Sequence, residues 1–169
     1  MKQKNDENYN PKIQKALNKL ISEEIIASEQ YIGSIVATCT CQSSEFAQMF
    51  EDIADDEYDD HYKKLVAYAI ANDYDVPFKW KDYEKHADPK AFRLLSSLKS
   101  GEKTKYYIEK AVESEKLAVE SYMQIAQDPD LPYEFTSICW QIYYDEVEHL
   151  SKLAILNDAL AAGAELKGF

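Results

Sequence analysis

The chain has 169 residues, a formal net charge of -12, a charged fraction of 30%, and only four glycines and five prolines. This length suits one domain with a sizeable core, and the composition favours long helices over a β-sandwich or barrel. A strongly acidic surface repels phosphate, which excludes nucleic acid as a partner. Because the sequence shows neither a signal-like start nor a long uncharged apolar run, we expect no membrane association and a cytoplasmic location.

The first half of the chain predicts two long helices. After a loose segment at residues 1–10, apolar residues recur at spacings of three and four over about 11–39. Asn10 is placed to cap this helix. A second helix is predicted over about 44–72, and the short link between the two makes them antiparallel neighbours.

The second half predicts another pair of helices after a long crossover at 73–101. The crossover contains a short helix over about 89–98, which begins at an Asp-Pro pair. A third long helix follows over about 102–127, and a fourth runs from the break at 128–132 to about Ala162. The predicted fold is therefore all-α: a single-domain, up-down four-helix bundle with a long crossover between its second and third helices.

Acids and histidines interrupt the apolar stripe of each long helix, where Leu or Ile would be expected. A buried ionised carboxylate is costly unless it is paired or bound to a metal. The candidate ligands are Glu24, Glu57, His61, Glu115, Glu146 and His149.

The neighbours of these residues repeat between the halves. In each half, the first Glu is followed seven positions later by Tyr, and the second Glu is preceded by Asp and followed by His. The matching sets are Glu24, Tyr31, Asp56, Glu57 and His61, then Glu115, Tyr122, Asp145, Glu146 and His149. The repeat predicts a pseudo-two-fold bundle with four carboxylates and two imidazoles near mid-height in one core.

Over about residues 12–160, the chain resembles the ferritin-like superfamily. The similarity to the first helix of bacterioferritin rests on Leu17–Leu20, Glu24, Gln30 and Tyr31. The segment Glu115–Tyr122 and the crossover with Trp80 are more similar to Dps-like ferritins that carry a bacterioferritin-type site.

The resemblance implies a centre that binds two iron ions per subunit, with manganese or zinc as possible substitutes. In this resemblance Glu24 and Glu115 are terminal ligands, one to each ion. Glu57 and Glu146 bridge the two ions, and His61 and His149 each cap one ion. The donor set suits iron or manganese, and four carboxylates balance two divalent ions. Around these ligands, we expect Asp56 and Asp145 to accept from the His on the facing helix. Tyr31 and Tyr122 are placed to hydrogen-bond the bridging carboxylates.

Helix two departs from the family pattern, because His61 follows Glu57 by four positions and not by three. A π-bulge near 57–61 would return His61 to the metal. Otherwise Asp60 ligates in its place, or the second metal position binds weakly. Tyr58 stands where bacterioferritin carries its haem-ligating Met, so no haem is expected.

The favoured function is oxidation of Fe(II) by O2 or H2O2 at this centre, followed by sequestration of Fe(III) in a homo-oligomeric cage. A 12-subunit cage is favoured over one of 24. One alternative is a rubrerythrin-like di-iron or di-manganese peroxidase or oxidase without a cage. Another is a non-catalytic helical interaction protein with a structural metal. The roles of Cys39, Cys41 and Cys139 stay open, although an odd cysteine count suggests reduced thiols.

Overall fold

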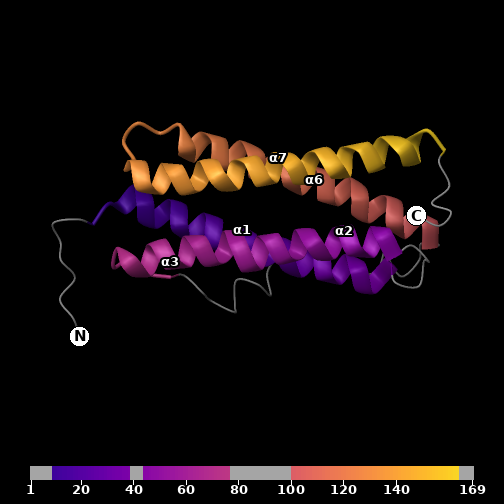
Figure 1. Ribbon diagram of the computed structural model, residues 1–169, viewed down its shortest axis with the longest axis horizontal. Helices are drawn as coiled ribbons and strands as arrows, with labels where there is room; N and C mark the ends of the chain where they lie inside the picture. Colours follow the sequence, from indigo (N-terminus) through magenta and orange to yellow (C-terminus); the bar gives the residue numbers. More distant parts are fainter. Residues whose placement is uncertain (1–8, 39–43, 77–99, 164–169) are drawn as a thin grey trace.

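Four helical rods make up the described part of the chain, which in this computed structural model comprises residues 9–38, 44–76 and 100–163. The second rod is composite, with α-helical turns on either side of a π-helical segment. The elements are α1 (Pro11–Thr38), α2 (Ser44–Asp55), η3 (Asp56–Tyr62), α3 (Lys63–Ala71), α6 (Ser100–Ala126) and α7 (Tyr133–Ala161) (Figure 1).

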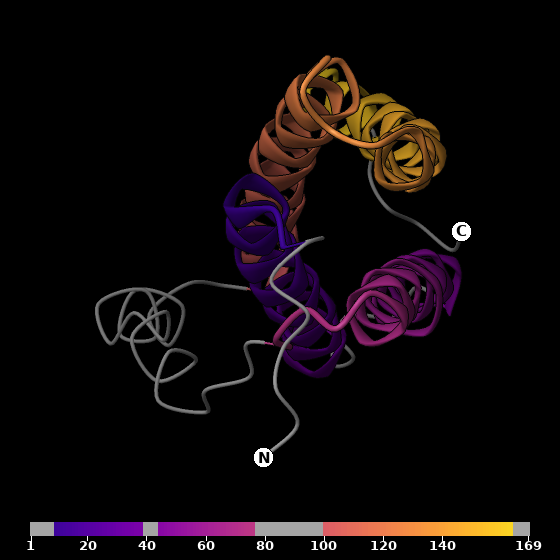
Figure 2. The same cartoon turned by 90° about the vertical axis from the view of Figure 1, so that its left-hand side faces the viewer.

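The rods form two antiparallel hairpins. One hairpin joins α1 to the rod α2–η3–α3, and the other joins α6 to α7. Viewed along the bundle, α1 lies against α6, while α7 and the rod α2–η3–α3 complete the other side (Figure 2). α6 runs in the direction opposite to α1, so the end of α3 and the start of α6 lie at opposite ends of the bundle.

The predicted all-α bundle is confirmed, and its long helices begin and end within about two residues of the expected positions, the usual spread of such boundaries. Asn10 caps α1, because its Oδ1 accepts the backbone N–H of Lys12 at 2.9 Å. Gly163 follows the end of α7 with φ of 82°, a left-handed conformation that suits glycine. The short helix expected over 89–98 and Trp80 both lie outside the described residues.

The buried apolar residues form two clusters, one toward each end of the bundle. One contains Leu17, Leu20, Ile21, Leu65, Phe135 and Ile142 among others. The other contains Tyr31, Phe50, Ile53, Ile108 and Leu153. On every rod, the predicted ligands fall between the two clusters in sequence. The apolar packing therefore holds a polar layer at mid-height.

Among the helices that the structure describes, none is both long and apolar enough to cross a membrane.

Candidate metal centre

All six predicted ligands meet in the polar layer, and each is at most 2% exposed. Each rod contributes to the layer, since the hairpins place the interrupted stripes face to face. The contributors are Glu24 on α1, Glu57 and His61 on η3, Glu115 on α6, and Glu146 and His149 on α7.

The six side chains form two overlapping groups, and within each group one ligand atom per residue lies within 4.8 Å of the others. The first group is Glu24, Glu57, His61 and Glu146, and the second is Glu57, Glu115, Glu146 and His149. Only Glu57 and Glu146 belong to both. This arrangement suits two adjacent metal positions with two shared carboxylates, each position having its own Glu and its own His.

Both imidazoles present Nδ1 to the middle of the layer. His61 Nδ1 lies 3.4 Å from an oxygen of Glu24, 3.4 Å from one of Glu57 and 3.5 Å from one of Glu146. His149 Nδ1 lies 3.5 Å from Glu57, and 3.8 Å from both Glu115 and Glu146. The two sets of distances are nearly equal because the two hairpins are related by a pseudo-two-fold axis.

The expected π-bulge is present and extends over Asp56–Tyr62. In a π-turn the hydrogen bond spans five residues, so each residue rotates less about the axis than in an α-helix. The fourth residue after Glu57 therefore returns close to the direction of that carboxylate. His61 faces the centre as a result, whereas the carboxylate of Asp60 pairs with Lys64 at 2.5 Å.

The two aspartates expected beside the histidines lie on the facing rods, as predicted. His149 Nε2 lies 3.1 Å from Asp56 Oδ2, and His61 Nε2 lies 3.5 Å from Asp145 Oδ2. An Nε2–H that points to a carboxylate leaves Nδ1 as the donor atom for a metal. Asp56 thus orients the imidazole of His149 with Nδ1 inward through a hydrogen bond, and Asp145 lies at ion-pair distance on the outer side of His61.

The expected partners of the two tyrosines were wrong. Tyr31 donates its hydroxyl hydrogen to Glu115 Oε1, and Tyr122 donates to Glu24 Oε1, so neither contacts a shared carboxylate. The reason is that each hydroxyl crosses the contact between α1 and α6, while the oxygens of Glu57 face the histidines. The tyrosines fix the orientation of the unshared carboxylates.

The unshared carboxyls favour their neutral form in the metal-free chain. Burial raises the pKa of Glu24 well above its usual value, and the negative charge of Glu57 raises it further. Burial raises the pKa of Glu115 in the same way, helped by its interactions with Glu146. Both groups therefore retain a proton at a pH where a free Glu is ionised.

The shared carboxylates and the imidazoles favour their charged forms. Burial opposes ionisation of Glu57, but its close contacts with Glu24, His149 and His61 hold its pKa below the usual range. Burial also opposes the imidazolium of His149, yet its contacts with Glu146 and Glu57 raise the pKa to about 11. Burial and the charge of Glu57 oppose ionisation of Glu146, but its contacts with His149, His61 and Glu115 lower its pKa. Burial opposes the imidazolium of His61, but contacts with Glu146, Glu24 and Glu57 raise its pKa. The metal-free layer is thus two cation–anion pairs with two neutral carboxyls.

The donor chemistry of the layer fits a pair of hard divalent ions. Buried polar atoms normally have partners, but several here lack a hydrogen bond among the described residues. They are Glu24 Oε2, Glu115 Oε2, both oxygens of Glu146, and His149 Nδ1. Metal ions bound by these atoms would satisfy them and neutralise the four carboxylates.

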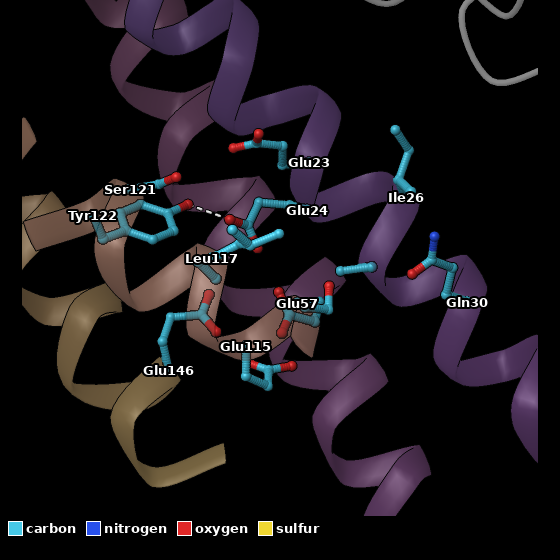
Figure 3. A pocket seen from close by; sticks show the side chains of 13 residues that line it. Glu23, Glu24, Ile26, Gln30, Glu57, Glu115, Leu117, Ser121, Tyr122 and Glu146 are labelled. Atoms are coloured by element: carbon cyan, nitrogen blue, oxygen red, sulfur yellow. Dashed lines mark hydrogen bonds between the residues drawn. The ribbon is translucent and has the colours of Figure 1, made fainter. Parts of the chain in front are cut away.

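A pocket of about 240 Å³ between α1 and α6 leads to the layer. Figure 3 shows the carboxylates of Glu24, Glu57 and Glu146 near one another, and the hydrogen bond from Tyr122 to Glu24. Sequence reasoning missed the pocket lining, which includes Glu23, Ser114 and Ser121. The available signal was that Glu23 and Ser114 directly precede the predicted ligands Glu24 and Glu115, and that Ser121 directly precedes Tyr122.

Cys139 lies in the apolar cluster beside the layer and is fully buried, and burial raises the pKa of its thiol to about 12. It behaves as a small apolar residue there. Cys39 and Cys41 lie outside the described residues.

A four-helix bundle with a buried carboxylate- and histidine-rich layer at mid-height is the architecture of the ferritin-like bundle proteins. The chain belongs to the ferritin family, because the model of that family, a ferritin-like domain, matches residues 14–161. No curated protein matches the chain.

Two solved structures share the fold. The M. penetrans ferritin is 17% identical with a TM-score of 0.69, and the alignment covers 90% of this chain and 87% of that one. The bacterioferritin-related protein from Bacteroides fragilis, a dodecameric thioferritin, is 22% identical with a TM-score of 0.67. That alignment covers 92% of this chain and 91% of the thioferritin.

Proposed function

We propose that the protein oxidises Fe(II) at the mid-height layer and sequesters the Fe(III) product, with O2 or H2O2 as the oxidant. The observation that carries the proposal is the pair of overlapping ligand groups that share Glu57 and Glu146. Two ferrous ions held side by side supply two electrons to one oxidant molecule. Membership in the ferritin-like family supports iron storage as the general role.

Each part of the layer has a distinct task in this proposal. Glu57 and Glu146 hold both ions at a short separation, and Glu24 and Glu115 each bind one ion. Tyr31 and Tyr122 hold these unshared carboxylates in place, and Asp56 holds the imidazole of His149 in the same way. The pocket between α1 and α6 supplies a path for Fe(II) and the oxidant.

The test compares Glu146→Ala with Glu148→Ala on the same helix. Glu146 is buried in the layer, whereas Glu148 is exposed and pairs with Lys152 at 2.8 Å. The first variant is expected to lose rapid Fe(II) oxidation, followed by absorbance, with its helix content retained. The second is expected to oxidise Fe(II) like the unmodified chain. Fast oxidation in both Glu146→Ala and Glu57→Ala would reject the proposed site.

We further propose assembly into a hollow homo-oligomer of 12 subunits, in preference to 24. The thioferritin from Bacteroides fragilis is dodecameric, and its alignment covers most of both chains. Each centre would lie within one subunit, because one chain supplies all six ligands. Light scattering tests the assembly: a particle mass near twice the 19.5 kDa chain would reject the cage and favour the stand-alone redox enzyme.

A further inference from the structure

The pocket between α1 and α6 has two ends that are equivalent in the internal repeat. Each end carries the residue just before an unshared carboxylate, and the residue just before the tyrosine that hydrogen-bonds that carboxylate. These residues are Glu23 and Ser121 at one end, and Ser114 and Gln30 at the other. Figure 3 shows Glu23 and Ser121 near Glu24, and Gln30 farther along α1. The two ends differ in their side chains, although the backbone relation between them is the same.

A lysine of α1 crosses the first of these ends. Lys19 Nζ donates to Ser121 Oγ at 2.8 Å, so its side chain reaches from α1 to α6. The same ammonium lies 3.9 Å from the carboxylate of Glu23. Because Ser121 and Glu23 both line the pocket, Lys19 joins its two walls and places a positive charge at this end.

The equivalent lysine on α6 is turned to its own helix. Lys19 and Lys110 occupy the same place in the internal repeat, since each precedes an unshared carboxylate by five positions. Lys110 Nζ pairs with Glu113 on α6 at 2.5 Å. In the first half, the position equivalent to Glu113 is Ser22, whose hydroxyl donates to its own helix at 2.8 Å. A neutral hydroxyl holds an ammonium less strongly than a carboxylate does, so Lys19 extends across to α6.

The charge of Lys19 acts on cations that enter the pocket and not on neutral molecules. Carboxylates at the inner side of the pocket attract a divalent cation, whereas an ammonium at its end repels one. O2 and H2O2 are uncharged, so the ammonium does not repel them. The side chain of Lys19 is 48% exposed and flexible, so it can leave Ser121 and let an ion pass.

We propose that Lys19 is a gate for cations, which closes the Glu24 end of the pocket by bridging α1 to α6. The inference rests on the proposed function, in which the pocket carries Fe(II) to the layer. While the ammonium holds Ser121 and Glu23, it blocks this end, and when it swings outward the end opens. Lys19 therefore sets how fast cations pass in either direction, and the six ligands set how tightly they are held.

The gate is tested by the rates at which Co(II) enters and leaves the layer, followed by its visible absorbance after rapid mixing. Lys19→Met removes the ammonium and keeps most of the length of the side chain. Lys110→Met is the matched control, because it changes the net charge equally at the equivalent place on α6. Lys19→Met is expected to bind Co(II) about two- to tenfold faster than Lys110→Met. Release of Co(II) to a strong chelator is expected to speed up by a similar factor, because a gate acts on passage in both directions.

A second pair of variants separates the bridge from the charge alone. Ser121→Ala removes the hydroxyl that holds Lys19 across the pocket but leaves the ammonium on the chain. Ser22→Ala is its control, because that hydroxyl bonds within α1. Faster entry of Co(II) is expected in Ser121→Ala and not in Ser22→Ala.

Three results would overturn the gate. They are equal entry rates in Lys19→Met and Lys110→Met, equal entry rates in Ser121→Ala and Ser22→Ala, and faster entry with slower release in Lys19→Met. The last result would mean that the charge of Lys19 changes the affinity of the layer and not the passage of ions. Because the readout is passage of Co(II), each of these results rejects the gate and leaves Fe(II) oxidation to be decided by the Glu146→Ala variant.

Discussion

Binding of two divalent ions to the metal-free centre is expected to release several protons per chain at pH 7, with an upper limit of about four. Two come from the imidazoliums, whose pKa values are raised, to about 11 in the case of His149. Two come from Glu24 and Glu115, whose carboxyls stay protonated because burial raises their pKa values. The charge balance agrees, because the layer is neutral both with two cation–anion pairs and with four carboxylates around two divalent ions.

This number separates the structured layer from a chance collection of acids. With unperturbed pKa values, the same six side chains would release only about half a proton at pH 7, nearly all of it from the histidines. Calorimetry with Co(II) in two buffers of different ionisation enthalpy gives the count, because the heat changes in proportion to the protons released. Identical heats in both buffers would refute the reasoning. A Glu24→Gln variant that still binds both ions should release about one proton fewer.

The other predictions concern stability without metal. Glu24→Gln is expected to raise the thermal midpoint of unfolding at pH 7. Above pH 4.5 the Glu24 carboxyl ionises in the unfolded chain but not in the folded chain, because its folded pKa is raised, and this difference favours unfolding. Scans below pH 4.5 should show no gain. The stabilisation from the charged His149 imidazole is fully present below pH 6.5, its pKa in the unfolded chain, and is lost as the pH rises toward its folded pKa of about 11. His149→Gln should therefore reduce the loss of stability at alkaline pH, followed by circular dichroism. Leu17→Ala, at a fully buried core position, is expected to cost about 2–5 kcal/mol in denaturant unfolding, and a cost near zero would contradict the packing described above.

The sequence predicted those features that follow from local periodicity. Helix boundaries and the ligand-bearing stripes depend on spacings within one helix, and they agree with the structure. The π-segment was predictable because the second half supplies an internal standard: His149 follows Glu146 by three positions, and His61 follows Glu57 by four. The pairing of each histidine with an aspartate on the facing rod followed from the same repeat.

What the sequence could not supply was the placement of side chains across two helices. The tyrosines were assigned to the shared carboxylates, because seven-residue spacing tells which face they share but not which helix their hydroxyls reach. The bridge from Lys19 to Ser121 was missed for a related reason, since it joins side chains of two helices that are 102 positions apart in the sequence. The pocket also depends on the packing of α1 against α6.

The exchange of hydrogen bonds between the hairpins has a consequence for how the protein is put together. Tyr31 of the first hairpin positions Glu115 of the second, and Tyr122 of the second positions Glu24 of the first. A lone hairpin therefore has half of the ligands and none of the contacts that orient its unshared carboxylate. Two chains that swap their second hairpins would rebuild two complete centres with every such contact intact. The bundle is in this sense a covalently joined dimer of hairpins, and the residues between α3 and α6 are the tether that makes the pairing intramolecular.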